Sequence, residues 1–86
     1  LHKMEKTTQE IAAIFTAAGD SVTLINGGKP EWEIDSEWKL TVQRNVEHLE
    51  TIKGYKKLDG TTSIWTTEDF TAIDKAIVDG KKVYGG

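Results

Sequence analysis

The chain has 86 residues, a net charge of −3 and 37% hydrophobic residues, which together indicate one folded domain with a small core. It contains no cysteine, so disulfides, thiolate zinc sites and a cysteine nucleophile are excluded. The acidic balance disfavours nucleic acid as the main partner, because phosphate contacts need clustered lysine and arginine. No apolar run approaches a membrane span, and no signal peptide is evident. We expect a single domain over residues 1–86, with flexible termini at 1–6 and 84–86.

The first predicted helix covers about residues 8–18. Thr7 is typical of an N-cap, and Glu10 three residues later completes a capping box. Four apolar residues then recur at helical spacing: Ile11, Ile14, Phe15 and Ala18. Gly19 is a typical stop at the carboxyl end, so we expect the helix to end there.

Two short β-prone runs, residues 22–25 and 31–34, flank a segment that contains Asn26-Gly27. This arrangement predicts a hairpin with a long turn. In the second run Trp32 and Ile34 alternate with acids, as in a strand with one buried face. The alternative is an ordered loop that places three apolar side chains over the helices: Leu24, Ile25 and Trp32.

The longest predicted helix covers about residues 36–53. Asp35 or Ser36 can cap its start, and Gly54 can end it. Five residues at spacings of four, three, four and three form a heptad-like seam: Trp38, Val42, Asn45, Leu49 and Ile52. The opposite face is polar except for Leu40, which makes this residue a candidate contact with another protein.

Asn45 is the polar residue of this seam. A buried amide costs stability unless its hydrogen bonds are satisfied, and such residues often fix the register or the partner of a helix pair. Two interpretations stay open: Asn45 selects a partner or register, or it braces the carbonyl of a neighbouring loop. His48 has no second metal ligand at helical spacing, so the favoured interpretation is a histidine beside the seam that hydrogen-bonds locally.

Residues 55–58 and 61–64 flank Asp59-Gly60, a strong turn signal that predicts a second small hairpin or a tight loop. A third helix follows, with Thr66 as N-cap and Asp69 at its third position. Trp65 should pack on Phe70 as a hydrophobic staple, and Gly80 should end this third helix.

The acids beside Trp65 could suggest a catalytic pair of carboxylates. Glu68 and Asp69 are adjacent on one helix, however, so their side chains diverge and do not face a common substrate. Both acids already suit the positive end of a helix dipole. We therefore predict no catalytic residue, no metal ligand and no cofactor, and we do not expect an enzyme.

Two stretches of the chain carry a resemblance. One reads Arg44-Asn45-Val46-Glu47-His48-Leu49-Glu50 after Trp38, and the other reads Trp65-Thr66-Thr67-Glu68-Asp69-Phe70-Thr71-Ala72-Ile73-Asp74. Together they are similar to small uncharacterised proteins of tailed bacteriophages, of the marine and cyanobacterial type, over about residues 38–80. The segment from Asp69 to Tyr84, with the run Ala72-Ile73-Asp74-Lys75-Ala76-Ile77 followed by Gly80 and Val83-Tyr84, also resembles the opening helix of phage head–tail joining proteins. The resemblance implies a phage origin and a role as a virion or assembly component.

The expected fold is mainly α, with α+β as an alternative: three helices and one or two short β-hairpins. Five aromatic residues should supply much of the core: Phe15, Trp32, Trp38, Trp65 and Phe70. The leading hypothesis is a non-enzymatic structural or adaptor protein of a phage particle that contacts other subunits, of its own kind or of other virion proteins. Its candidate contact residues are Leu40, Asn45, His48, Trp32 and Trp38. The alternative is a free, acidic regulator that inhibits a host nucleic-acid enzyme. Either would act in the virion or the host cytoplasm, without a membrane partner.

Overall fold

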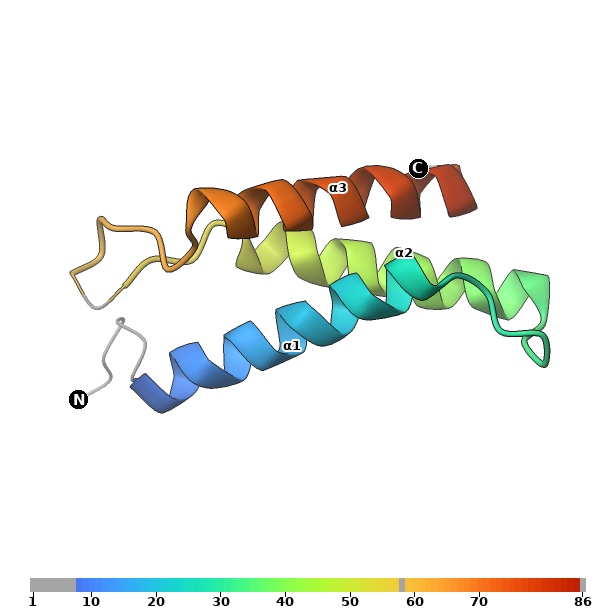
Figure 1. The fold of residues 1–86 in the computed structure, drawn as a ribbon, viewed down its shortest axis with the longest axis horizontal. Coiled ribbons are helices and arrows are strands. Elements are labelled where there is room, and N and C mark those ends of the chain that lie inside the picture. Colours follow the sequence, from blue (N-terminus) through green and yellow to red (C-terminus); the bar gives the residue numbers. More distant parts are fainter. Residues whose placement is uncertain (1–7, 58, 86) are drawn as a thin grey trace.

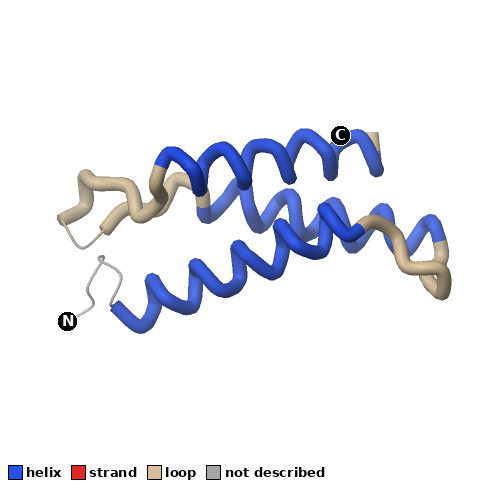
Figure 2. Tube along the Cα trace, in the orientation of Figure 1, coloured by secondary structure: helices blue, strands red, loops and turns tan. Residues whose placement is uncertain are grey.

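Three helices make up most of the chain in the computed structural model, which describes residues 8–57 and 59–85. Helix α1 spans Thr8–Gly27, α2 spans Asp35–Ile52 and α3 spans Thr67–Tyr84. Each helix packs against the other two, with α2 behind α1 and α3 in the view of Figure 1. The tube in Figure 2 shows no strand among the described residues. The mainly helical, three-helix prediction is confirmed, and the part of the chain that the structure describes contains neither predicted hairpin.

Helix α1 is longer than predicted, because it continues through Gly19 to Gly27. The predicted stop and the predicted strand over residues 22–25 are therefore both wrong. Ala18, Ser21 and Ile25 are all buried, so the inward-facing stripe continues at helical spacing beyond the glycine. A glycine inside a helix costs only about 1 kcal/mol relative to alanine, which burial of this stripe can offset.

Neither of the two predicted turns, Asn26-Gly27 and Asp59-Gly60, joins two strands: the first ends α1 and the second lies in a loop. After α1 the chain turns at Gly28, whose φ of 75° lies in the left-handed region. The second signal gives a single bridge between Lys56 and Ser63 among the described residues. Asp59 closes this loop by accepting hydrogen bonds from the backbone N–H groups of Thr61 and Thr62, both at 2.8 Å. Local side-chain bonds thus satisfy the backbone where a ladder was expected.

Helix α2 begins at Asp35 and ends at Ile52, within one residue of the prediction. Its N-cap is Ile34, which supplies no side-chain hydrogen bond, so the predicted caps Asp35 and Ser36 already lie inside the helix. The apolar members of the predicted seam are all buried: Trp38, Val42, Leu49 and Ile52. The heptad-like spacing therefore identified the face that the other helices cover.

Helix α3 starts as predicted and ends later than predicted. Thr66 and Asp69 form the expected capping box, with the Asp69 N–H donating to Thr66 Oγ1 at 3.1 Å. The helix does not stop at Gly80 but continues to Tyr84, and Gly85 ends it with a φ of 77°. Tyr84, the first residue of the segment expected to be flexible, packs against the core, whereas residues 1–6 lie outside the described part of the chain.

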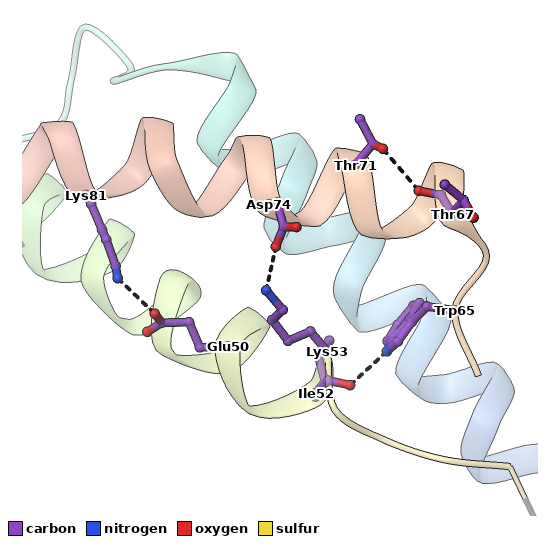
Figure 3. Close-up of polar contacts among 8 residues, drawn as sticks. All are labelled: Glu50, Ile52, Lys53, Trp65, Thr67, Thr71, Asp74 and Lys81. Atoms are coloured by element: carbon purple, nitrogen blue, oxygen red, sulfur yellow. Dashed lines mark hydrogen bonds and ion pairs between the residues drawn. The ribbon is translucent and has the colours of Figure 1, made fainter. Parts of the chain in front are cut away.

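The aromatic residues divide between the core and the surface. Trp38 and Trp65 are buried, and Phe70 is partly buried against the core, as predicted. The Trp65 indole Nε1–H donates to the Ile52 carbonyl at 2.8 Å, which ties the start of α3 to the end of α2 (Figure 3). Phe15 is 42% exposed and meets the Trp65 ring edge-on, with centroids 5.1 Å apart. Trp32 lies outside the core, since 79% of the residue is exposed.

Candidate protein-contact surface

The loop between α1 and α2 is an ordered turn held by Lys29. The Glu33 N–H donates to the Pro30 carbonyl at 3.1 Å. The Lys29 ammonium donates to the Glu33 carbonyl at 3.1 Å and forms an ion pair with Asp35 at 3.5 Å. The Lys29 ammonium is therefore already occupied by partners in and beside the loop. These contacts hold the loop in place and so fix the directions in which its other side chains point.

Trp32 lies in this loop and is 79% exposed. The neighbouring apolar residue Ile34, at the N-cap of α2, is 61% exposed. The alternative that a loop tucks Leu24, Ile25 and Trp32 over the helices is thus wrong for Trp32, while the other two lie within α1. A tryptophan provides a large, rigid contact area at low entropic cost, which makes an exposed one a typical anchor for a partner.

A groove of about 430 Å³ lies beside Trp32, and we call it the Trp32 groove. Residues from the second half of α1, the loop and the first half of α2 line it: Asp20, Thr23, Leu24, Gly27, Gly28, Pro30, Trp32, Glu33, Trp38 and Thr41. Trp38 is only 7% exposed, so its ring belongs to the core and borders the groove from within. The exposed Trp32 and the buried Trp38 therefore contribute to one apolar recess.

The surroundings of the Trp32 groove are acidic. Residues 20–40 contain five acids, Asp20, Glu31, Glu33, Asp35 and Glu37, against two lysines, Lys29 and Lys39. Two of these acidic residues, Asp20 and Glu33, are among those that line the groove itself. Lys29, the nearer lysine along the chain, is bonded to the loop carbonyls and Asp35. The groove therefore combines an aromatic wall with negative charge.

The five predicted contact residues lie in three different places. Trp32 and Trp38 border the Trp32 groove. Leu40 is 46% exposed on the outer face of α2, as its position on the polar side predicted. Asn45 and His48 are partly buried on the side of α2 that faces α1. Of this set, the Trp32 groove brings together the two tryptophans.

Both ends of the Asn45 amide are used within the chain. Ser21 Oγ, which is buried in α1, donates to Asn45 Oδ1 at 2.8 Å, and Asn45 Nδ2 donates to the Thr41 carbonyl at 2.8 Å. The sequence left two interpretations of Asn45 open: it selects a partner or register, or it braces the carbonyl of a neighbouring loop. The observed contact joins Asn45 to Ser21 of another helix and does not involve a loop. The helix pair that it joins is α1 with α2 of the same chain.

His48 follows Asn45 by three residues on the same side of α2. Its Nε2 atom is buried and has no hydrogen-bond partner among the described residues. Within that part of the chain, no group of three or more His, Asp or Glu side chains could hold a metal ion. His48 is a half-buried side chain at a helix interface.

A second groove of about 430 Å³ lies between α1 and α3. Its lining is mostly apolar and includes small residues: Phe15, Ala18, Gly19, Val22, Thr23, Trp65, Asp69, Ala72 and Ile73. The carboxylate of Asp69 is engaged, because it accepts from the Thr66 N–H at 3.0 Å. This groove has less exposed aromatic surface than the Trp32 groove, since Trp65 is buried.

The polar pairs between α2 and α3 have a structural explanation. Lys53 pairs with Asp74, and Lys81 pairs with Glu50 at 2.9 Å (Figure 3). The hydrogen bond and the charge of Glu50 raise the pKa of Lys81. These exposed ion pairs join the two helices along one edge.

Sequence reasoning missed Ile34, Leu24, Asp20 and Glu33 as parts of this surface. For Glu33 and Ile34, the signal that could have found them is Pro30 followed by alternating acids and apolar residues directly before a helix, since proline fits poorly within a strand. Comparisons of this chain with models of protein families, with curated proteins and with solved structures gave no match. Among the described residues, no helix is both long and apolar enough to cross a membrane.

Proposed function

We propose that this protein is a non-enzymatic structural or adaptor component of a phage particle that works through protein–protein contacts. The observation that carries the contact role is Trp32, which is 79% exposed beside a recess of about 430 Å³. Large exposed apolar groups beside a preformed recess are typical of protein interaction sites. The phage setting is supported by the sequence resemblance over about residues 38–80.

The physical basis of the contact would be burial of the Trp32 and Ile34 side chains by a partner subunit. Burial of apolar surface contributes about 25 cal/mol per Å², and a buried aromatic residue often dominates an interface. Because the loop is already ordered by the bonds of Lys29, little conformational entropy is lost when a partner binds. Leu40, on the outer face of α2, is a second apolar residue that a large partner could cover.

A photo-crosslinking amino acid in place of Trp32 tests this proposal directly. The same group in place of Glu68 is the matched control, because Glu68 is exposed in the first turn of α3, at the other end of the bundle (Figure 1). In cells that assemble the particle, we expect position 32 to crosslink to one capsid or tail subunit, or to a second copy of this chain. Position 68 should give no such product. Equal crosslinking from both positions would contradict the proposed contact.

The second candidate function is an acidic regulator that inhibits a host nucleic-acid enzyme. It is favoured by the five acids within residues 20–40, which could compete with phosphates for a basic site. Under this alternative, position 32 would crosslink to a nuclease or polymerase. The purified protein would remain monomeric and would bind that enzyme with an affinity that falls steeply with salt. That result would replace the assembly proposal.

A further inference from the structure

We infer that the Trp32 groove binds an arginine side chain of another protein. This inference rests on the proposed contact function and specifies the chemistry of the partner. A purely apolar recess would accept many side chains, whereas this one has two acidic residues in its lining together with an exposed tryptophan. Asp20 and Glu33 both line the groove, and neither carboxylate takes part in a hydrogen bond or ion pair with the described residues.

The indole of Trp32 supplies the first part of the recognition. A guanidinium group is planar and weakly hydrated, so it stacks on an aromatic face while its edges remain free to donate hydrogen bonds. Trp32 offers such a face because 79% of the residue is exposed and it borders the recess. The apolar lining from Leu24 and Pro30 can contact the methylene groups of the arginine stem.

The carboxylates supply the second part. Asp20 belongs to α1 and Glu33 to the loop, so negative charge approaches the recess from two separate elements. An arginine that stacks on Trp32 could direct its N–H groups toward these acids. Charge-assisted hydrogen bonds of this kind are roughly twice as strong as neutral ones. The loop's own cation does not fill this role, because Lys29 bonds to the Glu33 and Pro30 carbonyls and pairs with Asp35.

Charge also excludes other occupants of the recess. Five acids against two lysines within residues 20–40 would repel nucleic acid and anionic lipid. A cationic side chain of a protein is attracted by the same field. Recognition of this type gives the contact its specificity, since a partner with a neutral or acidic residue at that position would leave the carboxylates desolvated and unpaired.

The test uses the full chain, labelled with nitrogen-15, and a small probe. N-acetyl-arginine amide is titrated while the three indole N–H signals are followed by NMR. N-acetyl-citrulline amide is the control probe, because it has almost the same shape but no charge. We expect the signals of Trp32 and Trp38 to shift and saturate with the arginine probe, at least about fivefold more tightly than with citrulline. The Trp65 signal should not move, because its N–H is bonded to Ile52.

Variants assign the effect to the groove. The double substitution Asp20→Asn with Glu33→Gln should reduce the affinity for the arginine probe to that for citrulline. The matched control, Glu47→Gln with Glu68→Gln, removes two carboxylates that do not line the groove and should bind the probe normally. An unmoved Trp65 signal in each variant shows that the fold is retained. Trp32→Leu should abolish saturation altogether.

Three results would overturn the inference. The probes could bind equally, the indole signals could stay unchanged, or the Trp32 signal could move with protein concentration alone. The last result would identify a second copy of the chain as the occupant. These failures are distinguishable from failure of the proposed function. If position 32 crosslinks to a virion subunit but the groove shows no preference for the arginine probe, the proposed adaptor role stands. Only the inference that the groove binds an arginine side chain then fails.

Discussion

Ser21 of α1 donates its hydroxyl proton to the side-chain oxygen of Asn45 on α2 at 2.8 Å, across an otherwise apolar helix interface. Ser21 is buried, and the apolar residues Val42, Val46 and Leu49 lie around Asn45 on α2. A bond between a buried hydroxyl and a partly buried amide is satisfied at only one relative position of the helices. The pair therefore favours one register of α1 against α2.

Replacement of Asn45 by leucine should destabilise the protein although it adds apolar surface. The substitution leaves the buried Ser21 hydroxyl without its acceptor, which costs about 1–3 kcal/mol of unfolding free energy. The double variant Ser21→Ala with Asn45→Leu removes both polar groups and should recover most of that loss. Urea unfolding of the two single variants and the double variant measures the coupling. Additive effects would show that the two side chains do not act as a pair.

Gly80 lies where α3 packs tightly against α2. A Cβ atom at this position would overlap Val46 and lie 3.2 Å from Val42. We expect Gly80→Ala to destabilise the fold by about 1–3 kcal/mol, because overpacking forces the helices apart. Gly19→Ala is the matched control: it lies in α1 with nothing near its added Cβ, so it should stabilise the helix by about 0.5–1 kcal/mol. Thermal unfolding compares the two, and equal shifts would refute the packing argument.

These two glycines show why helix ends were harder to predict than helices. Both were expected to stop a helix, and both lie inside one. Local propensity favours a stop at glycine, but Gly80 is required by the close approach of α2, which only tertiary packing reveals. At Gly19 the buried stripe simply continues to Ile25. The seam of α2 and the capping box of α3 were predictable because each depends on residues close together in sequence.

The candidate site was less predictable than the fold. Trp32 alternates with acids, and this pattern suggested a strand with a buried face, whereas the side chain is exposed. The groove depends on Asp20 and Glu33, which are separated by the end of α1 and a turn at Gly28. No local pattern relates residues across such a turn. Trp38, in contrast, was correctly placed in the core seam. It also borders the Trp32 groove, and its role as a contact residue stays a prediction.

Thr66 is the N-cap of α3, and its replacement by alanine should lower the free energy of unfolding by about 1 kcal/mol. The substitution removes the Thr66 Oγ1 acceptor of the Asp69 N–H bond at 3.1 Å. Thr71→Ala is the control, because Thr71 is exposed within the same helix and its hydroxyl only bonds back to the Thr67 carbonyl at 3.0 Å (Figure 3). Chemical denaturation should find the control neutral or slightly stabilising. A loss of equal size in both variants would contradict the capping role.

Asp59 makes the stability of the second loop depend on pH. Its carboxylate accepts bonds from the Thr62 hydroxyl and from the backbone N–H groups of Thr62 and Thr61, and these bonds lower the pKa of Asp59 well below its usual range. Because the folded pKa is the lower one, this contribution to stability is present above the unfolded pKa of about 3.9 and is lost as pH falls below it. Asp59→Asn lacks the titrating group. The difference in urea midpoint between wild type and Asp59→Asn should therefore be constant from pH 8 to about pH 5 and should shrink below about pH 4. A difference that stays constant through this acidic range would show that the carboxylate does not hold the loop.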